Sequence, residues 1–488
     1  MVPLVAFALQ VPLLVAPPDV EVEVVVGPGH PAAGVTLIAP LLGTETVLFD
    51  LAGRPVHRWQ HTHTPGLACR LLEDGSLLRC ARGGRSHVFG GSGGEGGRLE
   101  RWDWSGELVW LFELDDEQRL LHHDAVPLPN GNVLAIAWER RTEEEVFEAG
   151  RRAAGLHAEG LWPDVLCEVR PNAARGGEVV WEWRAWDHLV QDARPGRPAF
   201  GAPADALGAI DVNFDLHPWA RAAEPSGADA VSLAGLGYVG APATAPGPDG
   251  SRGPEGSHGR EGTPRTGPVS RDWLHTNSVD YDPVHDLILL SVRATGEIWV
   301  LDHSTTTAEA RGVSGGRQGR GGAILWRWGN PLASSRGGER QLFGQHDARW
   351  LGNGRVLVFD NGLGRPHPTR SRVLEVQVPI DADGLVSRAP SAPDAPLWVF
   401  DGGETEGFYA SHLSGAQRLS NGNTLITRGT DGIVFEVTPE GQVPWRMRAT
   451  AARGAAGAQG RALNGAVGLF RALRYPLDCP GLARLAAE

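Results

Sequence analysis

Three histidines stand at matching places in a recurring sequence pattern, and histidine can act as nucleophile, general acid or hydrogen-bond donor near neutral pH. His123 and His346 each lie eight residues before the glycine of an Asn-Gly turn, in HHDAVPLPNG and GQHDARWLGNG. His275 opens the matching segment between them, WLHTNSVDYDPVHD, which has a longer turn. Arg293 closes the second strand of that middle hairpin, in LLSVRATGE, so it returns to the end at which His275 stands.

Three imidazoles and a guanidinium around one point favour transfer or cleavage of a sulfuryl or phosphoryl group. Arginine offers a permanent planar fork that suits a tetrahedral oxyanion, and no carboxylate pair or Ser-His-Asp order accompanies the cluster. Three histidines are also a ligand set for zinc or iron, although an arginine beside them would repel a cation. Each histidine alone could instead be structural and bond backbone. The following histidines lack this register and are expected to be structural or exposed: His122, His303, His412, His61 and His63.

The elements that would position these residues belong to a repeat that runs through most of the chain. Its first half is a hairpin, usually with an Asn-Gly or Asp-Gly turn, the strongest short-range hairpin signal. This half occurs in LLEDGSLLRC (71–80), LPNGNVLAIA (128–137), YDPVHDLILLSV (281–292), LGNGRVLVFD (351–360) and LSNGNTLITR (419–428). Its second half is another strand pair, whose closing strand carries Trp59, Trp110, Trp181, Trp326, Trp398 or Trp445.

Six closing strands predict an all-β fold, a six-bladed β-propeller of four-stranded antiparallel blades. Equivalent positions in successive blades have equivalent radius and height, so the three histidines and Arg293 should converge on the axial channel. We expect GVTLIAPLL, after Pro31, to supply a ring-closing partner and RALRYPLDCPGL (471–482) to finish or cover the ring. The 17 tryptophans, against 4 tyrosines, then mainly pack between blades, with an aromatic ligand cage as the alternative. A linear solenoid fits long, hairpin-rich units less well.

Two parts of the chain depart from the repeat. Residues 1–33 form an apolar N-terminal segment, either an atypical export signal or a first strand, too short to span a bilayer comfortably. The propeller is expected over 34–488, interrupted at about 194–270 by an insertion rich in glycine, proline and alanine. We expect the second half of this insertion to be flexible and IDVNFDLHPWA (210–220) to be ordered against one face.

Composition excludes several classes of function. A net charge of −13 and a pI near 5.7 argue against a nucleic-acid or anionic-membrane surface. The chain has no lysine, which excludes the phosphate-loop GK[ST] motif, Schiff-base enzymes and the kinase VAIK strand. The four cysteines form no CxxC pair and no zinc spacing. Cys69 and Cys80 flank the turn at Asp74 and Gly75, and we favour two buried thiols there over a disulfide.

At the site residues the sequence resembles the bacterial arylsulfotransferase family, whose members form six-bladed propellers. The matching stretches are HHDAVPLPNGNVL, DWLHTNSVDYDPVHDLILLSVRATGEIWVLDHSTTT, LWRWGNP and FGQHDARWLGNGRVLVFDNG. The resemblance covers residues from about 35 to 485, apart from the insertion. That family moves a sulfuryl group from one phenol to another without the nucleotide donor (PAPS) of cytosolic sulfotransferases, so the resemblance implies an aryl sulfate donor, a phenolic acceptor and no cofactor or metal.

The resemblance also implies a role for each site residue. His346 would be the nucleophile and form a transient sulfohistidine. Arg293 and His275 would hold the sulfuryl oxygens, Asn277 would line the site, and His123 would donate to the sulfate or to the bridging phenol oxygen. Well-studied members are exported, which suggests a periplasmic or secreted protein. Two other functions stay open: a non-catalytic propeller that binds an anionic or aromatic ligand or a protein partner, and a metal-dependent enzyme using the three histidines.

Overall fold

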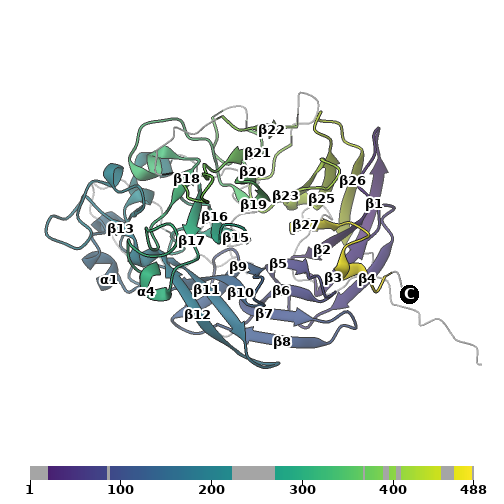
Figure 1. Cartoon of the computed structure of the whole chain (residues 1–488), viewed down its shortest axis with the longest axis horizontal. Helices are drawn as coiled ribbons and strands as arrows, with labels where there is room; N and C mark the ends of the chain where they lie inside the picture. The colour runs from purple at the N-terminus through teal and green to yellow at the C-terminus, as the bar shows by residue number, and fades with distance from the viewer. Residues whose placement is uncertain are drawn as a thin grey trace, which may run out of the picture.

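The strands of the protein are arranged as six sheets around a central axis. In the computed structural model of the chain, the described residues are 20–84, 88–221, 270–366, 369–387, 395–402, 408–451 and 467–485. Within them, the six sheets are antiparallel and follow one another round a ring (Figure 1). The prediction of an all-β, six-bladed propeller with four-stranded blades is therefore confirmed.

Each blade runs from an innermost strand at the axis to an outermost strand at the rim. Blade 1 consists of β27 (Leu469–Tyr475), β2 (Val35–Pro40), β3 (Glu45–Phe49) and β4 (Pro55–Gln60), and blade 2 of β5 (Pro65–Leu71), β6 (Leu77–Arg82), β7 (Gly97–Trp102) and β8 (Leu108–Glu113). Blade 3 consists of β9 (Arg119–Pro127), β10 (Val133–Glu139), β11 (Asp164–Pro171) and β12 (Gly177–Arg184).

The remaining blades follow the same order along the chain. Blade 4 consists of β15 (Thr276–Asp282), β16 (Leu287–Val292), β17 (Glu297–Asp302) and β18 (Trp326–Trp328), and blade 5 of β19 (His346–Gly352), β20 (Arg355–Asp360), β21 (Arg372–Gln377) and β22 (Trp398–Phe400). Blade 6 consists of β23 (Gly415–Arg418), β24 (Thr424–Arg428), β25 (Ile433–Val437), β26 (Trp445–Ala451) and, at its rim, β1 (Val20–Val26).

The ring is closed by strands from both ends of the chain. The C-terminal strand β27 pairs with β2, with Leu473 opposite Leu37, and forms the innermost strand of blade 1. The expectation that the C-terminal tail finishes the ring is confirmed. At the other end, β1 pairs with β26 as a fifth strand of blade 6. Residues 1–19 lie outside the described residues.

The middle strands of the blades are apolar on both faces because a neighbouring blade covers each face. All six residues of β16 (LILLSV) and all seven of β10 (VLAIAWE) are buried. Strands at the rim are less covered: in β1 only Val20 is buried, and the other six residues are half-buried or exposed. This burial pattern explains why the inner hairpins read as continuous apolar runs rather than as alternating ones.

The tryptophans of the closing strands join each blade to the next. In five of them the indole Nε1–H donates to the neighbouring blade: Trp59 to Asp103 O (2.8 Å), Trp110 to Gly176 O (2.9 Å), Trp181 to Thr305 Oγ1 (3.2 Å), Trp398 to Pro439 O (3.5 Å) and Trp445 to Leu51 O (2.9 Å). Each ring thus buries a large apolar area and satisfies its one polar atom. The structural interpretation of these tryptophans is confirmed.

His303, in the DHSTTT stretch, adds a polar contact between blades 3 and 4. Its Nδ1 lies 2.7 Å from Asp286 Oδ1, and its Nε2 lies 3.0 Å from Glu168 Oε2 of blade 3. Burial alone would lower the pKa of His303, but these two carboxylates raise it to about 9. The expected structural role of His303 is that of a charged link between two blades.

Several short helices and strands lie outside the blades, next to blades 3 and 4 (Figure 1). They are α1 (Glu143–Glu148), η1 (Ala153–Gly155), η2 (Ala185–Asp187), β13 (Leu189–Val190), η3 (Pro203–Asp205), β14 (Ile210–Asp211), η4 (Phe214–Leu216), α2 (Pro218–Arg221) and α4 (Thr307–Ala310), with η5 (Pro331–Ser334), η6 (Gly429–Asp431) and η8 (Pro480–Leu482) elsewhere. Two residues of the predicted insertion, Val212 and Asp215, are bound by an arginine from outside it. The buried guanidinium of Arg151 donates to Val212 O and to both carboxylate oxygens of Asp215. Residues 222–269 lie outside the described part. No helix among the described residues is long and apolar enough to cross a membrane.

All four cysteines are free thiols. The hairpin places Cys69 opposite Arg79, not opposite Cys80, because the turn shifts the register by one residue. The two thiols also pack into different core clusters on opposite faces of blade 2. The preference for two buried thiols is confirmed, and the disulfide alternative is wrong.

Candidate active site

The structure brings the four residues predicted from spacing to one end of the axis. The imidazoles of His123 and His275 are in contact, with ring centroids 4.7 Å apart at an angle of 76°. The backbone N–H of Arg293 donates to His275 O (3.3 Å), so the hairpin returns to that histidine as predicted, and the guanidinium charge of Arg293 acts on His123 and His346. The side chains of His123, His275 and His346 are all buried.

An irregularity in the innermost strand accompanies each site histidine. The pairing of β9 with β10, of β15 with β16 and of β19 with β20 shifts register at His123, beside His275 and at His346. The backbone is left-handed at His123 (φ 54°), His275 (φ 50°) and Asp347 (φ 55°), a conformation that residues other than glycine rarely adopt. Such strain persists only where the surrounding structure holds it, and it is typical of functional sites.

The side chain of Asn361 determines which nitrogen of His346 carries the proton. Its Nδ2 donates to the carbonyls of Ala410 (2.8 Å) and Leu413 (3.1 Å), so its Oδ1 must be the atom that faces His346 Nδ1 at 2.7 Å. Gly344 O, also an acceptor, lies 3.0 Å from the same nitrogen. Both partners require Nδ1–H, and Nε2 of His346 therefore keeps its lone pair.

A buried carboxylate orients His275. Asp272 Oδ2 accepts a short hydrogen bond from His275 Nδ1–H and another from Ser92 Oγ (2.8 Å), while Oδ1 accepts from Trp138 Nε1 (2.9 Å). Burial alone would raise the pKa of Asp272, but His275 and the other donors hold it below its usual range. The imidazole of His275 is thus presented with Nε2 outward and a negative charge behind it.

His123 lies in a tight setting against blade 2. A Cβ on Gly94 would collide with the imidazole ring of His123, and the backbone N–H of His123 donates to Gly94 O (3.0 Å). Its Nδ1 is 2.8 Å from Nδ1 of His122, which stacks on Trp138 at a centroid distance of 4.2 Å. His122 thus supports His123, in agreement with its expected structural role.

Burial and mutual repulsion keep two of the histidines neutral. Desolvation, together with the nearby charges of His275 and Arg293 among others, holds the pKa of His123 well below its usual range. Desolvation and Arg293 do the same to the pKa of His346. At neutral pH the permanent positive charge of this group is the Arg293 guanidinium, which suits an anionic substrate.

Asn277 holds the chain that leads into His346. Its Nδ2 donates to Gln345 O (2.8 Å), and the buried amide of Gln345 in turn donates to Val292 O (2.9 Å) and Glu297 O (2.8 Å). Asn277 Oδ1 is buried and has no hydrogen-bond partner among the described residues. Asn277 thus supports the approach to His346 with one amide N–H and leaves Oδ1 as an acceptor.

Blade 6 contributes a residue that the sequence analysis left aside. His412 is buried on the turn between Ala410 and Leu413, the two residues whose carbonyls bind Asn361. Burial and the nearby Arg293 lower the pKa of His412 to about 3. The signal in the sequence was a histidine ten residues before Gly422, two positions out of register with the other blades.

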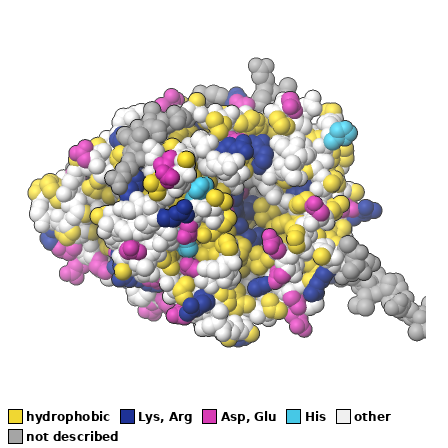
Figure 2. All heavy atoms as spheres, in the orientation of Figure 1, with side chains coloured by type: hydrophobic (Ala, Val, Ile, Leu, Met, Phe, Trp, Pro, Cys, Tyr) yellow, Lys and Arg dark blue, Asp and Glu magenta, His cyan; other side chains and the backbone are white. Residues whose placement is uncertain are grey.

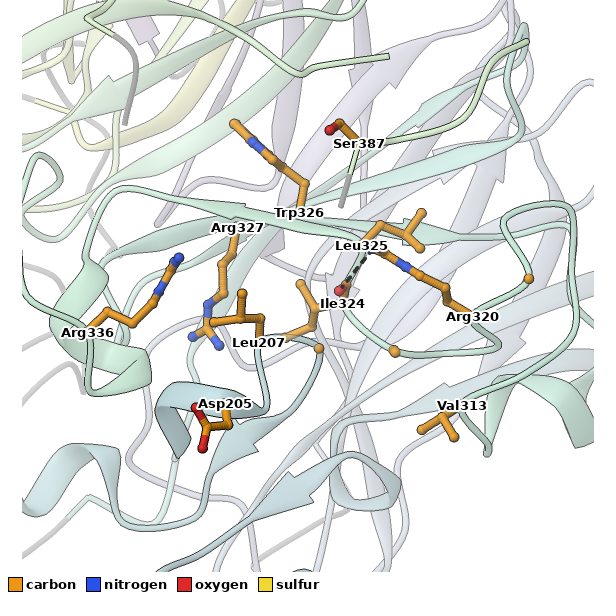
Figure 3. A pocket seen from close by; sticks show the side chains of 13 residues that line it. Asp205, Leu207, Val313, Arg320, Ile324, Leu325, Trp326, Arg327, Arg336 and Ser387 are labelled. Atoms are coloured by element: carbon orange, nitrogen blue, oxygen red, sulfur yellow. Dashed lines mark hydrogen bonds between the residues drawn. The ribbon is translucent and has the colours of Figure 1, made fainter. Parts of the chain in front are cut away.

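The cluster lies apart from a hollow at the rim beside blade 4. Basic atoms are visible in the hollow at the centre of the ring in Figure 2. A separate cavity of about 460 Å³ lies beside β18 at the rim, lined by Leu207, Ile324, Arg327 and Arg336 among others, and contains none of the site residues (Figure 3). In the described part of the chain no three His, Cys, Asp or Glu side chains are arranged to hold a metal ion.

Comparison with known proteins gives a family for this arrangement. Residues 49–444 match the arylsulfotransferase (ASST) family. The chain is 25% identical over 339 residues to the arylsulfate sulfotransferase AssT of Lelliottia amnigena, a match that covers 64% of this chain and 46% of the relative. It thus spans about half the length of this curated relative.

Solved structures with a similar chain path are more distant. A protein of unknown function from Bacteroides caccae has a TM-score of 0.42 at 11% identity, with 85% of this chain and 93% of that one covered. The periplasmic gluconolactonase of Pseudomonas aeruginosa has a TM-score of 0.40 at 14% identity, with 86% and 97% covered. The family match extends over most of the propeller and includes every site residue described above. The chain belongs to the arylsulfotransferase family.

Proposed function

We propose that the protein transfers a sulfuryl group from an aryl sulfate to a phenolic acceptor through a sulfohistidine on His346, in two displacement steps. Membership of the arylsulfotransferase family supports such an activity in broad terms. The observation that carries the finer proposal is the fixed proton on Nδ1 of His346, because it leaves Nε2 as an uncharged nucleophile in a buried site.

In the first step, the Nε2 lone pair of His346 attacks sulfur, an N–S bond forms, and the bond from sulfur to the phenolic oxygen breaks. The electron pair of that bond leaves with the phenolate. His346 keeps its Nδ1 proton, and the positive charge that its ring gains is met by the Asn361 and Gly344 oxygens. Arg293 pairs with the sulfuryl oxygens, a preorganised interaction worth roughly 3–4 kcal/mol by analogy with an oxyanion-hole donor.

His275 is the group best suited to give the leaving phenolate a proton. Its Nδ1–H is bound to the Asp272 carboxylate, which orients the ring and leaves Nε2 to give and take back the proton. His123 is kept neutral by burial, so its ring has one N–H, which would donate to the sulfate or to the bridging oxygen. Asn277 Oδ1, which can only accept, would contact the O–H of the phenolic acceptor rather than the sulfate group.

In the second step, a phenolic acceptor attacks the sulfohistidine. Its oxygen forms the new bond to sulfur, the N–S bond breaks, and the electron pair returns to Nε2 of His346. His275 takes the phenolic proton that it would have lost in the first step, so both proton and charge balance over the cycle. No cofactor or metal enters either step.

The test is the release of 4-nitrophenol from its sulfate ester by wild-type protein and His346→Asn, with and without added phenol. We expect release that phenol stimulates, loss of release in the variant, and a sulfonated His346 peptide when donor alone is added. A His275→Gln variant should lose more activity with phenyl sulfate, whose leaving group has a pKa of about 10 like tyrosine, than with the nitrophenyl ester. Unchanged turnover in His346→Asn would refute the assignment of the nucleophile, and binding without release would favour a non-catalytic propeller.

A further inference from the structure

Directly beside the histidines, six charged side chains, three of them buried and three half-buried, form one group that we call the axial ion network. It consists of three carboxylates and three guanidiniums: Asp124, Asp280, Asp347, Arg70, Arg349 and Arg471. Asp124 follows His123 in the chain, and Asp347 follows His346. The formal charges of the network cancel, so it adds no net charge to the site.

Arg471 connects the two carboxylates that are adjacent to site histidines. One of its terminal nitrogens lies 2.7 Å from Asp124 Oδ2, and the other lies 3.2 Å from Asp347 Oδ1. The three side chains are at most 3% exposed. The guanidinium is thus held between blade 3 and blade 5 by a strand, β27, that comes from the C-terminal end of the chain.

The carboxylates also bind backbone across blade boundaries. Asp124 Oδ2 accepts from the N–H of Val279 in blade 4 (3.3 Å). Asp347 Oδ2 accepts in the same way from the N–H of Ala416 in blade 6 (3.2 Å). Together with Arg70 from blade 2 and Arg471 from blade 1, the network touches all six blades at the axis.

A group of this kind contributes more to geometry than to stability. Ion pairs lose about as much in desolvation as they gain in attraction, so burying them is weak evidence of net stabilisation. Removing one member, however, leaves the remaining charges unbalanced. Without Arg471, Asp124 keeps Arg70 and Arg349 and Asp347 keeps Arg349, so one negative charge is in excess and the carboxylates must move or take up a proton. The backbone beside them is left-handed at His123 and Asp347 and needs to be held there.

We propose that Arg471 is a positioning residue for sulfuryl transfer: by joining Asp124 to Asp347 it sets the separation between His123 and His346. The inference rests on the proposed function, in which the two histidines act on one sulfuryl group. It makes the C-terminal strand a part of the active site, although β27 carries none of the reacting groups.

The same strand offers a matched control. Arg474 is also a buried arginine of β27, and it pairs with Glu436 of blade 6 and with Thr36. Its ion pair lies outside the axial ion network and touches none of the site histidines. Replacing Arg474 with methionine therefore removes a buried ion pair of ring closure and leaves the proposed positioning contacts in place.

The experiment compares Arg471→Met, Arg471→Lys and Arg474→Met by melting temperature, kcat and KM. Both methionine variants should melt at lower temperature. Well below melting, Arg471→Met should lose about tenfold to a hundredfold in kcat with little change in KM, the range expected for a misplacement of about 1 Å. Arg474→Met should keep kcat within about threefold. Arg471→Lys should be intermediate, because an ammonium is a point charge that cannot span both carboxylates as a guanidinium does.

Equal kcat in Arg471→Met and Arg474→Met would overturn the proposal. If Arg471→Met does not fold, Arg471→Lys takes its place, and a wild-type kcat in that variant would overturn the proposal. An independent readout is the imidazole ¹⁵N spectrum, with His123 and His346 assigned by substitution. Their signals should change in Arg471→Met and stay as in the wild type in Arg474→Met, and unchanged signals in Arg471→Met would refute the inference. If the wild type transfers no sulfuryl group, the proposed function fails, and this spectrum still decides the role of Arg471.

Discussion

Replacing Asn361 with leucine should slow sulfuryl transfer without removing the nucleophile. Leucine keeps the branched shape but offers His346 Nδ1–H no acceptor, so the ring keeps only the bond to Gly344 O at 3.0 Å. A hydrogen bond is worth about 0.5–1.5 kcal/mol to a neutral partner and about 1.5–3 kcal/mol to a charged one. The ring becomes positive as the N–S bond forms, so losing this acceptor destabilises the transition state more than the resting enzyme. We expect the activation free energy to rise by about 1–2 kcal/mol, which slows the step roughly fivefold to thirtyfold.

The same substitution also carries a stability cost that must be separated from the rate effect. The carbonyls of Ala410 and Leu413 would both lose their Asn361 donor, because the one proton of the Ser371 hydroxyl is given to Asn361 O at 2.8 Å. Each buried acceptor without a partner costs about 1–3 kcal/mol. Ser371→Ala is the matched control, because Ser371 donates to Asn361 O (2.8 Å) and holds the Ala410 turn without touching the imidazole.

The assay is single-turnover release of nitrophenolate with donor alone, recorded beside thermal unfolding of both variants. We expect the release rate to fall in Asn361→Leu and to stay near wild type in Ser371→Ala, while both proteins unfold at lower temperature. A release rate in Asn361→Leu within twofold of the Ser371→Ala rate would refute the argument that the amide orients the nucleophile.

Three further outcomes follow from the geometry. Gly94→Ala should lower steady-state turnover at least tenfold, because the added Cβ collides with the ring of His123. Gly91→Ala is the control, since Gly91 is also left-handed but has open space around it, and its turnover should not fall in this way. The pKa of His303 is about 9 in the folded protein against 6.5 in the unfolded chain, so its contribution to stability is complete below pH 6.5 and is lost as the pH rises through 9. Urea titrations should therefore show a free energy of unfolding that falls across that pH range, and His303→Gln should flatten this fall. Trp445→Phe should reduce the free energy of unfolding by about 1–3 kcal/mol, since it leaves a carbonyl of the neighbouring blade without its indole donor, as denaturant titration would measure.

The fold could be predicted from the sequence because the repeat shows it directly. Asn-Gly and Asp-Gly turns fix hairpins locally, and one tryptophan per unit marks the closing strand that packs on the next blade. Counting those strands predicted the number of blades, and the register of His123, His275 and His346 predicted that they converge. Spacing could not predict the exact strand register. A difference of one residue at the turn places Cys69 opposite Arg79 instead of opposite Cys80.

The residues that support the site were beyond reach for a physical reason. Repeat register identifies groups that occupy the same position in successive blades, but a supporting group occupies whatever position completes a hydrogen bond. Asp272 lies just outside its strand, Asn361 ends a hairpin, and Arg471 arrives from the far end of the chain. Such contacts depend on the closed ring, and no local pattern encodes them.

This dependence makes the site a test of the complete ring. His346 stands on blade 5, yet its tautomer is set by an amide that blade 6 holds in place, and the carboxylate beside it is paired with blade 1. A chain that has formed its separate blades but has not docked β27 would therefore contain every reacting side chain and lack their arrangement. Activity should consequently appear in refolding only with closure of the ring, later than the burial of the blade tryptophans. Stopped-flow fluorescence followed by a double-jump activity assay would measure the two phases, and activity that rises together with the first fluorescence change would contradict this order.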